Sequence, residues 1–164
     1  MMSNMSLMPV LFISHGAGPA WYIDSRRESM GMLKDVDMHS KSADVMRNLR
    51  SVAGLPRKPR AILVISAHWE EPEHTVTTSP KPSLYFDYCG FPESTYKLEW
   101  PVPGEPDVAR SVVRLLESSG IRCRENGKRG LDHGVFVPLK LAYPEADVPG
   151  DAMGIPVELL TQEF

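Results

Sequence analysis

The sequence has 164 residues, of which 42% are hydrophobic and 24% charged, and its formal net charge is −3. This length suits one domain with a core of its own. A slightly acidic chain without a long basic run argues against nucleic acid or an anionic membrane as the main partner. The two cysteines, Cys89 and Cys123, form no CxxC or metal-finger pattern, which favours a reducing, cytoplasmic location. We find no signal-peptide features and no apolar run long enough to span a bilayer.

Two short apolar runs, residues 8–14 and 61–66, are rich in Val, Ile and Leu. Continuous runs of this length are typical of strands that are covered on both faces. Between the runs, Val45, Leu49 and Val52 recur at helical spacing before a glycine. The three segments together predict a right-handed βαβ unit.

The rest of the chain continues the alternation of strands and helices. Residues 75–79 alternate and are β-rich, so they predict a further strand, whereas residues 79–106 predict a long, ordered functional loop that is rich in Pro, Gly and aromatic residues. Residues 121–126 predict an edge strand and residues 134–144 a short helix. We therefore expect one α/β domain over residues 1–164, with a parallel or mixed central sheet flanked by helices.

Residues 105–120 form the clearest predicted helix. It has a proline near its start, a glycine at its end, and an expected apolar face of Val108, Val112, Leu115 and Leu116.

A histidine follows each of the two predicted apolar strands. "VLFISHG" contains His15, and "VISAHWE" contains His68. Ligands of open α/β sheets bind outside the carboxyl ends of the strands, so neighbouring strands would bring both imidazoles to one edge. Two imidazoles and one more ligand would suit Fe(II) or zinc. The residues alone also allow each histidine to be a polar strand end that is hydrogen-bonded to a loop.

A third histidine, His133, lies between glycines in "GLDHGVFVP". It is either an ordinary histidine of a surface turn or a proton-transfer group near the metal edge. The neighbouring Asp132 is expected to cap the following segment rather than to contact the ring. His39 and His74 lie in polar surroundings, and we expect both to be exposed to solvent.

The carboxylates form no obvious acid–base pair. Glu70 and Glu71 follow the second histidine and are simplest to interpret as solvated, whereas Asp87 could reach the mouth of a pocket. The sequence contains no GxSxG elbow, P-loop or GxGxxG motif. A zinc hydrolase is therefore a weaker hypothesis, because no carboxylate base stands out.

Four motifs occur in order along the chain: "FISHGAGP", "VISAHWE", "FDYCGFPESTYKLEWPVPGEP" and "GLDHGVFVPLKLAYPEADVP". Together, over residues 8–149, they resemble the class III extradiol ring-cleavage dioxygenases of the LigB superfamily, in its 4,5-DOPA dioxygenase-like branch. The resemblance implies that His15 and His68 bind Fe(II) or zinc and that His133 transfers protons without binding the metal. It also implies a catechol and O₂ as substrates, with the loop from Tyr85 to Trp100 shaping the catechol pocket.

The resemblance is weaker at the C-terminal end. The family carries a further histidine ligand downstream, whereas no histidine follows His133 here, and residues 150–164 look like a divergent tail. We therefore expect a LigB-like fold that is shortened at its C-terminus and whose exposed sheet favours a homo-oligomer. Two hypotheses follow: a metal-dependent ring-opening dioxygenase, or an inactive metal-binding or interaction module of the same fold.

Overall fold

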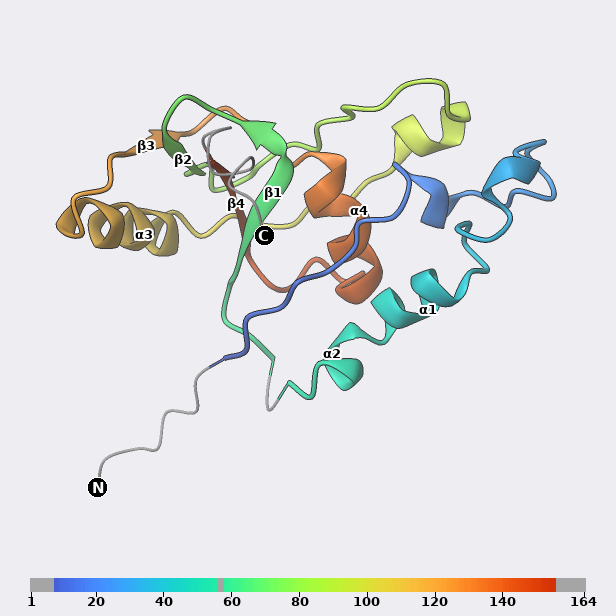
Figure 1. Cartoon of the computed structure of the whole chain (residues 1–164), viewed down its shortest axis with the longest axis horizontal. Coiled ribbons are helices and arrows are strands. Elements are labelled where there is room, and N and C mark those ends of the chain that lie inside the picture. The colour runs from blue at the N-terminus through green and yellow to red at the C-terminus, as the bar shows by residue number, and fades with distance from the viewer. Residues whose placement is uncertain (1–7, 56–57, 156–164) are drawn as a thin grey trace, which may run out of the picture.

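A computed structural model of the chain describes residues 8–55 and 58–155 (Figure 1). Its centre is a four-stranded mixed sheet with the strand order β1-β4-β2-β3. The strands are Ile62–Glu70 (β1), His74–Thr77 (β2), Cys123–Asn126 (β3) and Gly150–Ile155 (β4). β1 runs parallel to β4 and β2 parallel to β3, whereas β2 and β4 are antiparallel. The predicted α/β class, with a mixed sheet flanked by helices, is confirmed.

Helices cover both faces of this sheet. The α-helices are Lys41–Arg47 (α1), Leu49–Val52 (α2), Pro106–Ser118 (α3) and His133–Ala142 (α4). Ala152 of β4 packs with α1 and α4 in the main core, whereas the next residue, Met153, packs with α3 in a smaller one. Successive side chains of a strand point to opposite faces, so α3 and α4 cover opposite sides of the sheet. Figure 1 shows α4 between β1 and α1. Within the described residues, no helix is long and apolar enough to cross a bilayer.

Most of the predicted elements are present. The predicted helix between the apolar runs forms α1 and α2, which are separated only by Asn48. The expected strands at residues 75–79 and 121–126 are β2 and β3, and β3 does lie at a sheet edge. The short helix expected at residues 134–144 is α4. The local sequence was sufficient for these elements because it combines apolar or alternating runs with glycine and proline at their ends.

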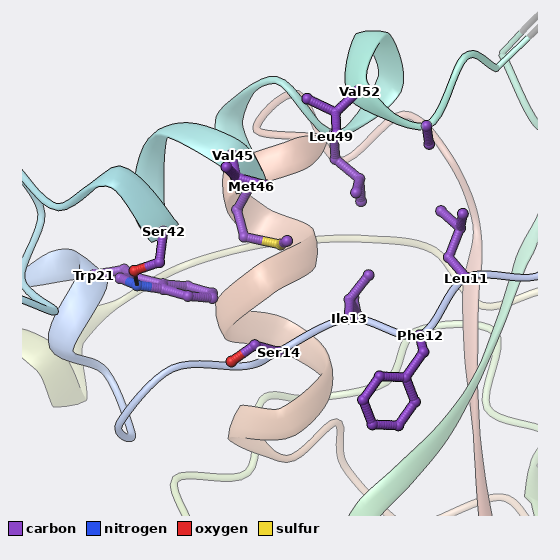
Figure 2. Close-up of a pocket in the computed structure, with 11 residues that line it drawn as sticks. Leu11, Phe12, Ile13, Ser14, Trp21, Ser42, Val45, Met46, Leu49 and Val52 are labelled. Atoms are coloured by element: carbon purple, nitrogen blue, oxygen red, sulfur yellow. Dashed lines mark hydrogen bonds between the residues drawn. The ribbon is translucent and has the colours of Figure 1, made fainter.

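Residues 8–14 do not form the predicted strand. They are extended, but their backbone makes no hydrogen bond with any other described residue. Figure 2 shows Leu11 and Ile13 turned toward α1 and α2, whereas Phe12 points the opposite way and is fully exposed. Packing against helices accounts for the apolar residues of this segment, but it supplies no backbone partner. The predicted βαβ unit is therefore wrong.

β1 is covered on one face only, although its apolar run predicted cover on both. Ile62 and Val64 pack against the main core, whereas Leu63 and Ile65 are 39% and 60% exposed. The helix on the other face, α3, packs mainly against β2 and β3. Edge position and incomplete cover thus leave two large apolar side chains in solvent.

The buried side of α3 also differs from the predicted face. Ala109 and Val113 are buried and Leu116 is partly buried against the smaller core. Val108 is exposed, and Leu115, which we expected to be buried, is 67% exposed. The predicted helix is present, but which of its faces is buried depends on how α3 packs across β2 and β3.

β4 lies in the centre of the sheet, although its residues belong to the segment that we expected to be a divergent tail. It pairs with β1 on one side and with β2 on the other. The remainder of the expected tail, residues 156–164, lies outside the described residues.

Candidate metal centre

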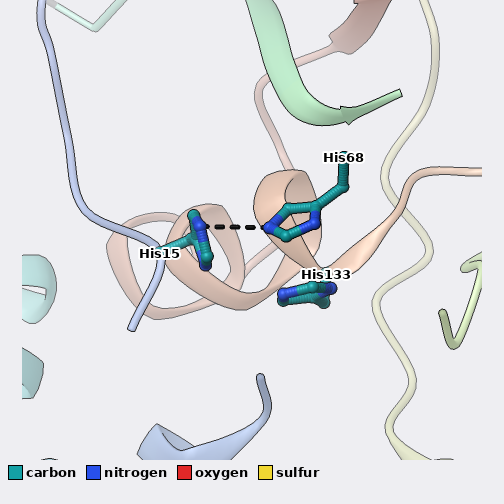
Figure 3. Close-up of side chains that lie close together, drawn as sticks. All are labelled: His15, His68 and His133. Carbon is teal, nitrogen blue, oxygen red and sulfur yellow. Dashed lines mark hydrogen bonds between the residues drawn. The ribbon is translucent and has the colours of Figure 1, made fainter. Parts of the chain in front are cut away.

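Three histidines from separate parts of the chain meet at one end of β1 (Figure 3). His15 follows the extended N-terminal segment, His68 lies within β1, and His133 is the first residue of α4. The Nε2 atoms of His15 and His68 are 3.1 Å apart. The ring centre of His133 lies 5.1 Å from that of His15 and 4.0 Å from that of His68. The structure therefore brings together all three predicted site residues.

The cluster has the dimensions of a metal site. One ligand atom can be chosen from each of the three rings so that all lie within 4.8 Å of one another. Two imidazole nitrogens that share a tetrahedral zinc ion at 2.0–2.1 Å would be about 3.3 Å apart, close to the observed 3.1 Å. The same short contact between His15 and His68 can be an N–H···N hydrogen bond when one nitrogen is protonated. The residues present thus fit a cation such as Fe(II) or zinc.

The electrostatics favour neutral, metal-binding imidazole at His15. Burial lowers the pKa of His15, and the positive charges that His68 and His133 would carry lower it further. Its Nδ1 atom is buried and has no hydrogen-bond partner among the described residues. A metal ion requires the neutral form of histidine, so a lowered pKa keeps this ring available at neutral pH.

Two buried polar residues, Ser66 and Asp132, form a hydrogen-bond network with the backbone of His68. Ser66 accepts a hydrogen bond from the backbone N–H of His68 and donates its own to Asp132, at 3.2 Å and 2.7 Å. The other oxygen of Asp132 lies 3.4 Å from the guanidinium of Arg129. We expected the side chain of Asp132 to cap the following segment. It makes no capping hydrogen bond to α4, so this prediction is wrong. A Cβ atom at Gly134 would lie 2.9 Å from the His68 ring, so this position requires a residue without a side chain.

His133 is held by a carboxylate that sequence reasoning placed only at the mouth of a pocket. Asp87 accepts a hydrogen bond from the backbone N–H of His133, and its second oxygen lies 2.9 Å from the ring Nδ1. Burial raises the pKa of Asp87, but the hydrogen bonds from His133 outweigh this effect and leave that pKa below its usual value. Nothing in the sequence pattern pairs these residues, which are 46 positions apart.

The other candidates lie outside the cluster. Glu70 is exposed, and Glu71 accepts a hydrogen bond from the indole N–H of Trp69. His39 is exposed as predicted, whereas His74 lies in β2 and is half-buried rather than exposed.

An apolar pocket of about 440 Å³ lies close to the cluster but does not include it. It is formed by residues 11–14, Trp21 and the inner side of α1 and α2 (Figure 2). Ser14 lines the pocket, whereas none of the three histidines does. An aromatic side chain lies beside the cluster: the ring centre of Tyr88 is 6.0 Å from that of His133, and Phe86 packs against Tyr88. The loop from Tyr85 to Trp100 therefore contributes a wall beside His133.

The family described as the catalytic LigB subunit of aromatic ring-opening dioxygenase matches residues 10–161. The chain belongs to the LigB family. This match confirms the resemblance found in the motifs, and it extends past the boundary at residue 149 into β4.

Several curated proteins are similar to most of this chain. A dioxygenase named tasH from Hapsidospora irregularis is 38% identical over 90% of the chain and 44% of its own length. The 4,5-DOPA dioxygenase extradiol of Beta vulgaris is 37% identical over 90% of the chain and 50% of its own length. The protein of the same name from Escherichia coli is 33% identical over 87% of the chain and 45% of its own length. The chain thus spans about half the length of these curated relatives.

One solved structure is similar to this chain in sequence and in fold. The crystal structure of an uncharacterized protein from Escherichia coli K12 superposes with a TM-score of 0.52 and 31% sequence identity. The superposed region covers 70% of this chain and 40% of the Escherichia coli chain.

Proposed function

We propose that this chain is a metal-dependent aromatic ring-opening dioxygenase that acts on a catechol such as DOPA. The observation that carries the proposal is the cluster of His15, His68 and His133 in a LigB-family chain. The catechol is proposed because similar proteins from Beta vulgaris and Escherichia coli are named 4,5-DOPA dioxygenase extradiol. The cytoplasmic location remains part of the proposal, and it is compatible with free thiols at Cys89 and Cys123.

In this proposal His15 and His68 hold Fe(II) or zinc, and His133 handles protons. Bound Fe(II) supplies the redox chemistry by which O₂ and a catechol react, whereas zinc supplies only Lewis acidity. His133 takes the proton of a catechol hydroxyl at its Nε2 atom, because Nδ1 is engaged with Asp87. The ring of Tyr88, backed by Phe86, lies 6.0 Å from that of His133 and offers an aromatic surface for the catechol in this proposal.

Oxygen uptake tests this proposal directly. The purified chain is loaded with Fe(II) without oxygen, its iron content is measured, and catechols including DOPA are then added with O₂. We expect O₂ consumption and a yellow ring-opened product, both lost in His15→Ala and both retained in the exposed-histidine control His39→Ala. An iron-loaded chain that consumes no O₂ with any catechol would refute the enzymatic function.

A second function is favoured by the uncovered apolar surface. Val10, Phe12, Leu63 and Ile65 are large apolar side chains exposed to solvent. An inactive module that binds metal and associates through this surface, with itself or with another protein, would retain zinc without turnover. Metal analysis combined with the oxygen assay separates the two functions.

A further inference from the structure

We propose that Asp87 is a positioning residue that fixes the tautomer of His133, so that Nδ1 carries the proton and Nε2 is presented to the site as a proton acceptor. The inference rests on the proposed function only for its catalytic consequence. The tautomer itself is a property of the chain without substrate or metal.

Backbone hydrogen bonds hold the loop that carries Asp87 beside the segment that leads into His133. Leu84 and Leu131 form a parallel bridge, and the N–H of Tyr85 donates to the carbonyl of Leu131 at 2.7 Å. Asp87 follows this bridge by three residues on one side and His133 follows it by two on the other. The carboxylate therefore reaches the start of α4 from a loop that is pinned beside it.

Both oxygens of Asp87 are used. One accepts the backbone N–H of His133 at 2.9 Å, and the other lies 2.9 Å from Nδ1 of the same ring. The first contact satisfies an N–H at the start of α4, where Asp132 provides no side-chain cap. It also places the negative charge at the positive end of the helix dipole. This contact orients the carboxylate so that its second oxygen meets the ring.

The chemistry of the two groups decides where the proton lies. An ionised carboxylate can only accept hydrogen bonds, so Nδ1 must be the protonated nitrogen of the neutral ring. Nε2 then carries the lone pair, on the ring edge opposite Asp87. A proton taken up at Nε2 would make an imidazolium whose charge Asp87 stabilises, as in other carboxylate–imidazole pairs.

The variant Asp87→Asn separates this role from simple capping. The asparagine side-chain oxygen can still accept the backbone N–H of His133, so α4 keeps its cap. Its amide NH₂ then faces Nδ1 and can only donate, which requires the proton of the neutral ring to move to Nε2. A purely structural residue would leave the tautomer unchanged.

The test is a long-range ¹H–¹⁵N NMR spectrum of the metal-free full chain at about pH 8, where an ordinary imidazole is neutral. The chain has five histidines, and His133→Gln assigns the relevant ring. We expect the Nδ1–H tautomer in the wild type and the Nε2–H tautomer in Asp87→Asn. The control Glu93→Gln changes an exposed carboxylate of the same loop that pairs with Lys97, and it should leave the spectrum of His133 unchanged.

The possible outcomes are distinct. An Nε2–H tautomer in the wild type overturns the inference without any variant, and so does an unchanged tautomer in Asp87→Asn. If the chain turns over a catechol, Asp87→Asn should lower kcat about 10²- to 10⁴-fold with little change in KM. If no catechol reacts, the proposed function fails, and the NMR result still decides the role of Asp87.

Discussion

Ser66 donates its hydroxyl hydrogen bond to Asp132 over 2.7 Å, and both side chains are buried. This bond joins β1 to the residue that precedes α4. It therefore ties the backbone that carries His68 to the backbone that carries His133. This buried contact therefore adds to the bonds that His133 makes with Asp87 in setting the relative placement of the two histidines.

Removing the Asp132 carboxylate should destabilise the fold. Asp132→Ala leaves the largely buried Arg129 without its ion-pair partner and Ser66 without its acceptor. Loss of one member of a buried pair costs about 3–5 kcal/mol, and we expect a loss at the lower end because Arg129 keeps some access to solvent. Urea denaturation measures this loss. The control Asp107→Ala, which breaks an exposed pair with Arg110, should change stability by less than about 1 kcal/mol. Equal effects of the two variants would contradict this account of the network.

Metal should stabilise the folded chain through the histidine cluster. An ion that binds the native state and not the unfolded state raises the melting temperature with its concentration. We expect added zinc to raise Tm in the wild type and to have little effect in His68→Ala. His74→Ala, which removes a histidine of β2 outside the cluster, should respond like the wild type. Differential scanning fluorimetry with a zinc titration measures this. A similar response in all three proteins would place the bound ion elsewhere.

Asp151 should lower stability at neutral pH. Its side chain is buried in β4, one oxygen has no partner among the described residues, and burial raises its pKa. The folded state thus holds this proton more tightly than the unfolded state, so stability is lost as the pH rises from the unfolded value through the folded pKa. Asp151→Asn should therefore stabilise the chain by roughly 1 kcal/mol at pH 7.

The gain from Asp151→Asn should shrink as the pH falls toward about 4, and it should vanish at about pH 3, because the acid is protonated in both states only below its unfolded pKa of about 3.9. Urea denaturation across this pH range measures it. Asp147→Asn is a matched control, because the nearby Lys58 lowers the pKa of this exposed carboxyl and no gain is expected. A gain for Asp151→Asn that does not depend on pH would show that removal of the charge is not its cause.

The uncovered apolar surface should cause self-association. Phe12 is fully exposed and Ile65 is 60% exposed, on the edge strand of the sheet. Exposed apolar edges of this kind pair with other chains. The double variant Phe12→Lys and Ile65→Lys should lower the association state in sedimentation velocity without reducing Tm. Leu115→Lys, on the exposed side of α3, is the control. A wild type that stays monomeric at high concentration would contradict the predicted homo-oligomer.

Local patterns in the sequence were enough to predict β1, β2, β3, α3 and α4, because apolar or alternating runs and the turn residues between them mark most of these elements. They failed where an element depends on what lies beside it. Residues 8–14 have the composition of a strand but pack against helices, and Leu115 of α3 was placed on the wrong side of the buried stripe.

The sequence by itself determined the α/β class, the LigB resemblance and the three histidines of the candidate centre, since these depend on residue types in short motifs. Only the tertiary structure decided that the histidines meet, that Asp87 holds His133, and that Ser66 and Asp132 support His68. The hydrogen bonds from His133 to Asp87, between His15 and His68, and from Ser66 to Asp132 join residues 46, 53 and 66 positions apart, and such a bond forms only where the fold brings donor and acceptor within about 3 Å. Spacing along the chain carries no information about such distances, because they are set by how the N-terminal segment, β1, the loop that carries Asp87, and α4 pack together.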